Sequence, residues 1–336
     1  MSVTLLRQRS QPVPTEVFAT YWRFAARRQD IFFARLAGAP GPWTEDPILQ
    51  RHRFTNAYRV LDRVSQYLVG TVIPSGAGRA EEVFFRVMLF KLFNKIETWE
   101  TLCEALGETP SWEHFDFDAM DSALSQARRS GGRIYSAAYI MPAAGQFGGG
   151  AKHRTHLRLV EWMMANGVPE QVGTAGTMGE AFEVLRGIHS FGDFLAYQLV
   201  TDLNYSDVCD FAEMEFVQPG PGARDGIAKC FASLGGYSEP DVIRWVADTQ
   251  ADQFAARGLD FRDLWDRPLQ LIDCQNLFCE VDKYARIAHP EILGRSGRTR
   301  IKQVFSPSGP LPWPTLPDKW GVEVSVQPVV ALAAVR

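Results

Sequence analysis

Acidic, amide and basic side chains are concentrated in residues 273–286, a stretch whose apolar pattern predicts a helix. On such a helix two polar edges form, one with Asn276, Glu280 and Lys283 and one with Gln275, Asp282 and Arg286. Carboxylates flanked by amides and cations suit general acid–base catalysis or the stabilisation of a developing positive charge. The simpler alternative is a surface ion pair between Glu280 and Lys283.

A second polar cluster lies near the N-terminus, within residues 48–69, which the spacing of apolar residues predicts to be one amphipathic helix. Its polar members are Arg51, Arg53, Asn56, Arg59, Asp62 and Arg63. Asn56, Arg59 and Arg63 would then share one helix face. This density of arginine favours contact with an anion such as phosphate, although a solvated charged face is the alternative.

Residues 185–198 contain a short turn, Ser190-Phe191-Gly192, between two apolar segments. The segment resembles the helix-hairpin-helix of DNA glycosylases, in which backbone N–H groups at a helix N-terminus bind a DNA phosphate. Gly192 and Ala196 match the second glycine and the alanine of that pattern, while Ser190 stands at the first glycine. A plain helical hairpin is the alternative.

The Gly/Pro loop of residues 216–222 opens another predicted helix. Gly220, Gly222 and Ala223 lie at this junction of loop and helix and are candidate DNA contacts. Asp225 follows them and could be catalytic, because hairpin-type glycosylases carry an aspartate after their hairpin. It could equally be an acidic residue in the first turn of a helix, where the helix dipole favours it.

The net charge of the 336-residue chain is −4, which argues weakly against a nucleic-acid partner. The charge is unevenly distributed, however, since residues 1–63 carry 10 basic and 5 acidic side chains and residues 151–273 carry 10 and 19. Residues 274–336 carry 8 and 5. The two basic ends could form a patch that attracts a phosphate backbone. We find no membrane-length apolar run and no secretory signal, and five cysteines suit a reducing cytoplasm, so we expect a cytoplasmic protein.

Common cofactor and metal motifs are absent from the sequence. The glycine-rich run of residues 145–150 comes closest to a nucleotide phosphate loop, but no Ser or Thr follows Lys152. Cys274 and Cys279 have no partner pair, and His153 and His156 have no visible third ligand. We therefore expect no cofactor and no metal.

The remaining pattern is mostly helical, which predicts an all-α fold. Helices are expected at about residues 18–36, 48–69, 80–106 (as one helix or two), 120–129, 155–166, 181–204, 223–234, 241–257 and 260–288, the last with a break at Pro268. The Pro-rich tail, residues 306–336, is expected to be extended, with a short strand at 322–326.

Together these segments resemble the α-glutamyl/putrescinyl-thymine pyrophosphorylase-like family, also described as amino acid:DNA transferases. That family is related to the helical domain of 5-hydroxymethyluracil DNA kinases. The resemblance covers about residues 17–303, and its most specific pieces are residues 42–63, 220–223 and 278–284. It implies a helix-hairpin-helix glycosylase-like fold. No kinase segment is visible in the sequence.

From the resemblance we expect an N-terminal arm (1–16), a catalytic domain (17–305) and the tail (306–336). The catalytic domain would form two lobes, 17–110 with 260–305 and 111–259, around a basic cleft. The expected catalytic residues are Glu280, Asp282, Asp62, Asn56 and Asp225. The expected base pocket is Asn276, Gln275, Tyr284, Tyr58 and Trp43. The expected DNA contacts are Arg51, Arg53, Arg59, Arg63, Lys283, Arg286, Arg298, Arg300, Lys302, Ser190, Phe191, Gly192, Gly220, Gly222 and Ala223.

Three hypotheses about function follow, all with double-stranded DNA that contains modified pyrimidines as the partner and with a monomeric protein. The first is a DNA glycosylase that flips out and excises a hypermodified pyrimidine from phage DNA, in anti-phage defence. The second is an amino acid:DNA transferase that displaces pyrophosphate from an activated 5-hydroxymethyluracil. The third is a non-catalytic DNA-binding module.

Overall fold

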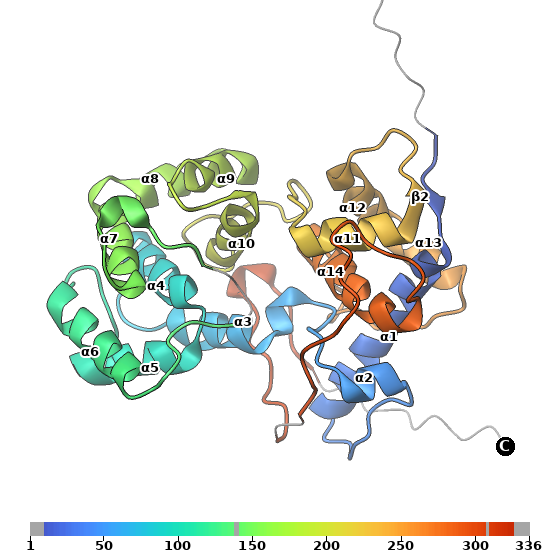
Figure 1. Ribbon diagram of the computed structural model, residues 1–336, viewed down its shortest axis with the longest axis horizontal. Helices are drawn as coiled ribbons and strands as arrows, with labels where there is room; N and C mark the ends of the chain where they lie inside the picture. Colours follow the sequence, from blue (N-terminus) through green and yellow to red (C-terminus); the bar gives the residue numbers. More distant parts are fainter. Residues whose placement is uncertain (1–9, 138–140, 307–308, 326–336) are drawn as a thin grey trace, which may run out of the picture. The chain divides into compact units, whose positions relative to one another are not determined.

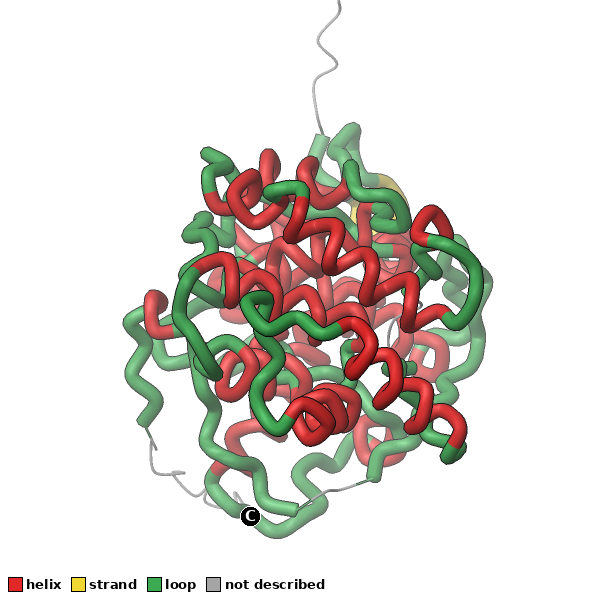
Figure 2. Tube along the Cα trace, turned by 90° about the vertical axis from the view of Figure 1, so that its left-hand side faces the viewer, coloured by secondary structure: helices red, strands yellow, loops and turns green. Residues whose placement is uncertain are grey.

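The computed structural model describes residues 10–137, 141–306 and 309–325, and helices dominate it (Figure 1). In this described part, strand is confined to one short antiparallel pair, β1 (Val13–Pro14) and β2 (Phe231–Ser233) (Figure 2). The all-α fold predicted from the sequence is confirmed. None of the helices in these ranges has the length and apolar character that crossing a membrane requires.

The chain divides into two compact units. The first comprises Met1–Asp62, Val217–Pro314 and Gly321–Arg336, and the second comprises Arg63–Phe216 and Thr315–Trp320. The helices of the first unit are α1 (Glu16–Leu36), α2 (Pro47–Arg51), η1 (Arg59–Leu61), α11 (Pro221–Cys230), α12 (Glu239–Asp248), α13 (Gln250–Ala255) and α14 (Leu271–Ala288). Those of the second are α3 (Arg63–Tyr67), η2 (Leu68–Val72), α4 (Ala80–Phe93), α5 (Ile96–Leu106), α6 (Phe117–Arg129), η3 (Gly145–Phe147), α7 (Lys152–Ala165), α8 (Val168–Gly173), α9 (Met178–Arg186), α10 (Asp193–Leu203) and η4 (Asp318–Trp320).

Helix α14 is central to the first unit, where α1, α11 and α12 pack against it. The ring of Tyr21 on α1 lies 4.6 Å from that of Phe278 on α14. Helices α11 and α14 approach so closely that a Cβ atom at Gly226 would clash with the carbonyl of Phe278. A Cβ atom at Gly222 would likewise clash with the side chain of Cys279. These two glycines are therefore required by helix packing.

Helix α4 is the core helix of the second unit. Its residues from Glu82 to Phe93 are all buried, and α5, α7, α8 and α10 pack around it. A helix that is apolar on nearly every side can be stable only when neighbours cover all of its faces. The predicted apolar stretch 80–106 is thus two helices, α4 and α5.

The two units divide the chain at other places than the expected lobes. Residues 63–110 belong to the second unit, because α4 packs with α7, α8 and α10. Residues 217–259 belong to the first unit, because α11 and α12 pack on α14.

The single helix predicted over residues 48–69 is wrong. Helix α2 ends at Arg51, residues 52–58 are not helical, and η1, α3 and η2 follow as short separate pieces. The cause is that the backbone N–H groups of Thr55, Asn56 and Arg59 donate to side-chain carboxylates rather than to carbonyls one turn earlier. The expected common helix face of Asn56, Arg59 and Arg63 therefore does not exist.

Several other predicted helices are shorter than expected. The stretch 181–204 is broken by the turn between α9 and α10, and 241–257 is broken at Thr249 between α12 and α13. Helix α11 ends at Cys230, where β2 begins to pair with β1. Residues 260–270 are not helical, since α14 starts only after the cap at Gln270, two residues beyond Pro268. Helix α8 was not predicted.

The C-terminal tail has little regular structure where it is described. Thr315 exchanges two hydrogen bonds with the side chain of Gln66, at 2.9 and 3.1 Å, and Lys319 donates to the carbonyl of Cys209 at 2.6 Å. Residues 322–325 form no strand, and 326, the last residue of the predicted strand, lies outside the described residues.

Candidate active site

Two carboxylates of the first unit hold the non-helical segment 52–58. The backbone N–H of Thr55 donates to Glu280 Oε2 at 2.9 Å, and that of Asn56 donates to Asp62 Oδ1 at 2.9 Å. Both carboxylates thus bind consecutive residues of one extended segment. The structure brings together three of the predicted catalytic residues, Glu280, Asp62 and Asn56, although a different backbone conformation was expected.

Arg28 joins this cluster from α1. Its Nε donates to the carbonyl of Thr55 at 2.9 Å, and its Nη2 donates to Asn56 Oδ1 at 3.1 Å. Burial lowers the pKa of Arg28 to about 10, while Asp62 and Glu280 oppose that shift. The guanidinium therefore stays charged at neutral pH. Sequence reasoning missed Arg28, which lies on a mostly apolar helix far from the other members.

The two carboxylates differ in their surroundings. Burial raises the pKa of Asp62 to about 6; the hydrogen bond from Asn56 opposes this rise, and Glu280 adds to it. Glu280 instead forms an ion pair with Lys283 at 2.7 Å, and the Lys283 ammonium lies 4.6 Å from the centre of the Phe54 ring. A carboxyl that titrates near neutral pH beside an ion-paired carboxylate is an arrangement suited to proton transfer. We call Arg28, Asn56, Asp62, Glu280 and Lys283 the carboxylate cluster.

Asn276 and Gln275 precede Glu280 by about one turn of α14. Asn276 is half-buried on the same helix edge as Glu280, so its amide could face a ligand there. Gln275 is buried, and its Oε1 has no hydrogen-bond partner among the described residues.

The three aromatic residues expected in the base pocket form hydrogen bonds within the first unit. The Tyr58 hydroxyl donates to the carbonyl of Arg267 at 2.7 Å, and that of Tyr284 donates to Asp46 at 2.6 Å. Trp43 donates through Nε1 to the carbonyl of Ala39 at 2.7 Å. Tyr58 and Tyr284 are buried, and Trp43 is half-buried. Their contacts give these residues structural roles.

The other two expected catalytic carboxylates are engaged in packing contacts. Asp282 is buried between Lys229, whose Nζ lies 3.0 Å from Oδ1, and Arg286, which binds Oδ2. Asp225 is buried on α11 and accepts hydrogen bonds from the backbone N–H and the hydroxyl of Ser296. Saturated carboxylates of this kind favour structural roles for Asp282 and Asp225.

Exposed cations gather beside the carboxylate cluster in the first unit. An antiparallel bridge joins His52 to Val304, and the N–H of Arg53 donates to the carbonyl of Gln303 at 3.1 Å. This pairing aligns two basic stretches whose exposed members are Arg51, Arg53, Arg298, Arg300 and Lys302. We call these five residues the basic stretch pair; all five belong to the predicted DNA surface and are open to solvent.

The remaining arginines expected at DNA are placed differently. Arg59 is buried, which argues against a phosphate contact. Its backbone N–H donates to Asp273 Oδ1 at 2.8 Å. Arg63 is exposed in the second unit and lies 3.3 Å from Glu97. Arg286 binds Asp282 and donates to the carbonyl of Arg300 at 3.0 Å. It therefore links α14 to the backbone of the basic stretch pair.

The segment that resembles a helix-hairpin-helix lies in the second unit, where it forms the turn between α9 and α10. Ser190, which stands at the first glycine of the resembled pattern, has a φ of +80°, a conformation that glycine adopts readily. Gly192 is exposed at the N-cap of α10, and Phe191 is buried. Of the small residues before Asp225, Gly220 caps α11 and is buried, Gly222 packs on α14, and Ala223 is fully buried, all of which argues against DNA contacts.

Histidines offer little for metal binding in the second unit. His156 bonds to the Tyr135 hydroxyl at 2.8 Å and to the carbonyl of Pro142 at 2.7 Å. In the first unit Glu16, His289 and Glu291 have potential ligand atoms within 4.8 Å of one another, but both glutamates are exposed. Exposed groups of this kind often bind no ion.

The comparisons with known proteins address the family. The sequence profile of the family described as "5-hmdU DNA kinase, helical domain" matches residues 15–294. The chain belongs to this family. The suspected relationship to the helical domain of 5-hydroxymethyluracil DNA kinases is thereby confirmed.

A curated relative in this family is the 5-hmdU DNA kinase of Bacillus phage SP10. It is 25% identical over 284 residues, which cover 79% of this chain and 44% of the relative. The chain therefore spans less than half the length of the curated relative it matches. No solved structure matches the chain significantly.

Proposed function

We propose that this protein is an enzyme that modifies a pyrimidine base in double-stranded DNA at a 5-hydroxymethyl group. The name of the phage relative, a 5-hmdU DNA kinase, supports a base of this kind as substrate. The observation that carries the proposal is the carboxylate cluster, in which Asp62 and Glu280 hold adjacent residues of one segment. The monomeric state, the cytoplasmic location and the cleft between lobes remain predictions.

The proposed reaction is the transfer of an amine to an activated 5-hydroxymethyluracil. The amine nitrogen forms a bond to the 5-methylene carbon, the bond from that carbon to oxygen breaks, and pyrophosphate leaves. The proton lost by the amine passes to Asp62, whose pKa of about 6 lets it accept a proton near neutral pH. Glu280 and Arg28 position the segment that carries Asn56 beside it.

DNA binding is assigned to the basic stretch pair. The target base must leave the helical stack, because atoms of a stacked base are shielded from an enzyme. Arg51, Arg53 and Arg300 can contact the backbone phosphates on either side of that base. The hairpin, with Gly192 at the N-cap of α10, is a second candidate for a phosphate contact.

Excision of the base is the second candidate function, and the same two carboxylates favour it. Cleavage of a glycosidic bond needs a carboxylate to stabilise an oxocarbenium-like sugar and to position water. Such a glycosylase could act on phage DNA in defence. A non-catalytic DNA-binding module is the third candidate, because a buried cluster can also be purely structural.

One assay separates the three functions. Duplex DNA with an activated 5-hydroxymethyluracil is incubated with the protein, with and without an added amine, and both pyrophosphate and abasic sites are measured. Transfer predicts amine-dependent pyrophosphate release and no abasic sites. Abasic sites without pyrophosphate release support excision, and neither product on any modified DNA supports the binding module.

Substitutions then test the site. Asp62→Asn should lower the rate about 10²- to 10⁴-fold, because it removes the proton acceptor. Glu280→Gln should also lower the rate, because it weakens the hydrogen bond that positions the segment carrying Asn56. Glu45→Gln, at an exposed carboxylate of the same unit, is the control and should leave the rate unchanged. Full activity in both cluster variants would show that the site is elsewhere.

A further inference from the structure

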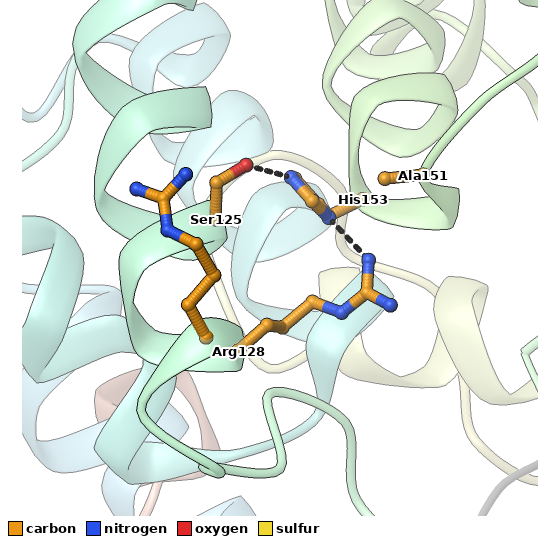
Figure 3. Close-up of a pocket in the computed structure, with 5 residues that line it drawn as sticks. Ser125, Arg128, Ala151 and His153 are labelled. Carbon is orange, nitrogen blue, oxygen red and sulfur yellow. Dashed lines mark hydrogen bonds between the residues drawn. The ribbon is translucent and has the colours of Figure 1, made fainter.

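A solvent-open cavity of about 320 Å³ lies in the second unit, between the end of α6 and the start of α7 (Figure 3). Its lining residues are Ser125, Arg128, Arg129, Ala151 and His153. None of the five is acidic, and two are arginines. Neither Arg128 nor Arg129 has an acidic partner within the described ranges of the chain. Unpaired arginines at the wall of a cavity are the usual means of binding an anion.

The exposed side chain of Arg128 contacts His153 at the cavity wall. His153 is buried, and its Nε2 lies 2.9 Å from Asp121 Oδ1 and 3.1 Å from the Ser125 hydroxyl. Because an ionised carboxylate can only accept, Nε2 carries the hydrogen and Nδ1 is free to accept. Arg128 Nη1 lies 3.5 Å from that Nδ1 (Figure 3). His153 therefore positions one guanidinium at the cavity wall.

The acidic group nearest to this arrangement is already neutralised. Asp121 accepts three hydrogen bonds from Arg154, the shortest of 2.6 Å, in addition to its contact with His153. Lys152 points elsewhere, since its ammonium lies over the Tyr135 ring at 4.4 Å. The positive charge at the cavity is therefore that of Arg128 and Arg129.

Helix α7 begins at the same place, since its N-cap residue Ala151 lines the cavity. Ala151 is its N-cap and supplies no side-chain acceptor, so the first N–H groups of this 14-residue helix are not capped by that side chain. The chain reaches the cap through Gly148 and Gly150, whose φ angles of +102° and +116° are glycine conformations. The glycine-rich run that resembled a phosphate loop thus leads directly into the cavity.

We propose that this cavity is a phosphate-binding site. Its volume of about 320 Å³ is at the small end of the range of about 300–1,000 Å³ for ligand pockets, which suits a phosphate or diphosphate group rather than a whole nucleotide. Arg128, Arg129 and the α7 N-terminus bind the anion, and His153 is a positioning residue. The phosphate belongs either to the DNA backbone or to a free ion such as pyrophosphate. This site does not depend on the chemistry proposed for Asp62 and Glu280.

The first experiment measures binding of inorganic phosphate and pyrophosphate to the full chain by calorimetry. Saturable binding is expected, and Arg128→Gln/Arg129→Gln should weaken it about tenfold or more, because each charge-assisted hydrogen bond is lost. The control is Arg133→Gln, an exposed arginine just beyond α6 that does not line the cavity, and it should leave binding unchanged. Thermal unfolding verifies that each variant is folded.

A second readout follows His153 by NMR. Burial lowers the pKa of His153 below its usual value, and a bound anion close to the ring should raise it. The rise should be absent in Arg128→Gln/Arg129→Gln. Asp62→Asn should change neither the calorimetric affinity for the ions nor the rise in the pKa of His153, which separates this site from the proposed reaction.

The third measurement identifies the source of the phosphate. If the DNA backbone supplies the phosphate, Arg128→Gln/Arg129→Gln should lower the slope of log duplex affinity against log salt concentration by about 1, which corresponds to one phosphate contact. If the double variant loses binding of the free ions but keeps the salt slope of duplex affinity unchanged, the site binds a free phosphate or pyrophosphate. The proposal is overturned if neither ion binds saturably and the DNA response is unchanged, or if Arg133→Gln has the same effect as the double variant.

Discussion

Helix α14 carries two buried carboxylates only two residues apart, Glu280 and Asp282, and their charges are compensated to different degrees. Asp282 is enclosed between Lys229 and Arg286, with side chains that are 1–10% exposed. Glu280 binds a backbone N–H of the extended segment and a single lysine that is 14% exposed. The comparison shows that the completeness of charge compensation, rather than residue type, separates a structural carboxylate from a candidate for chemistry.

The enclosed carboxylate, Asp282, should be the more important for stability. Asp282→Asn removes the negative charge and leaves Lys229 and Arg286 buried without compensation. The free energy of unfolding should fall by about 3–5 kcal/mol, measured by urea denaturation. Asp252→Asn, at an exposed position on α13, is the control and should change it by less than about 0.5 kcal/mol.

Replacing the whole enclosed group tests the interpretation. Lys229→Met/Asp282→Leu/Arg286→Met should recover most of the lost stability, since apolar residues of similar size often replace a buried ion group without loss. A triple variant as unstable as Asp282→Asn would show that packing, not charge compensation, holds this part of α14.

Close packing of α11 on α14 gives the next largest effect. Gly226→Ala places a methyl group against the carbonyl of Phe278 and must push the two helices apart. We expect a loss of about 1–3 kcal/mol in unfolding free energy. Gly107→Ala is not a suitable control because of its positive φ, whereas Gly78→Ala meets no neighbouring atom and should be nearly neutral. Equal effects at the two positions would contradict the packing argument.

Sequence patterns predicted the parts of the fold that depend on local interactions. Asp46 caps α2 and Pro47 begins it, residue types that favour these two positions by themselves. The apolar spacing likewise identifies α1, α4 and α5. These features are set by residues within a few positions of one another, so a pattern can reveal them.

The carboxylate cluster depends instead on contacts between distant residues. Asn56 and Asp62 were predicted from a helix that does not form, because Glu280, more than 200 residues away, binds the backbone of Thr55. Arg28 has no distinguishing neighbours in the sequence and becomes recognisable only from its hydrogen bonds. Local patterns carry no information about such long-range pairings.

Beside Glu280, the stability contributed by Asp62 should depend on pH. The pKa of about 6 exceeds the value of about 3.9 for an unfolded aspartate, so the folded state favours the protonated form. Stability from this group is full below the unfolded pKa and is lost as pH rises toward 6. Asp62→Asn stays neutral, and its stability relative to wild type should therefore increase by about 1–2 kcal/mol between about pH 4 and pH 7.

Urea unfolding at several pH values measures this difference. The control is Asp252→Asn, whose difference from wild type should stay constant over the same range. If the free energies of unfolding of wild type and Asp62→Asn change with pH in parallel, Asp62 is an ordinary surface carboxylate. Protonation then does not distinguish the surroundings of Glu280 from those of Asp282.

The smallest effect concerns the basic stretch pair. Arg53 and Arg300 are exposed, and the pairing of residue 53 with residue 303 aligns their two stretches. Arg53→Gln/Arg300→Gln should weaken duplex binding severalfold and lower the salt slope of the affinity by about 2, one unit for each lost phosphate contact. Fluorescence anisotropy at a series of salt concentrations measures that slope. The control is Arg23→Gln, at an exposed arginine on α1, which should leave the salt slope unchanged. If Arg23→Gln lowers the slope as much as the double variant does, DNA is attracted by the overall charge of the unit. The basic stretch pair then has no specific role in DNA binding.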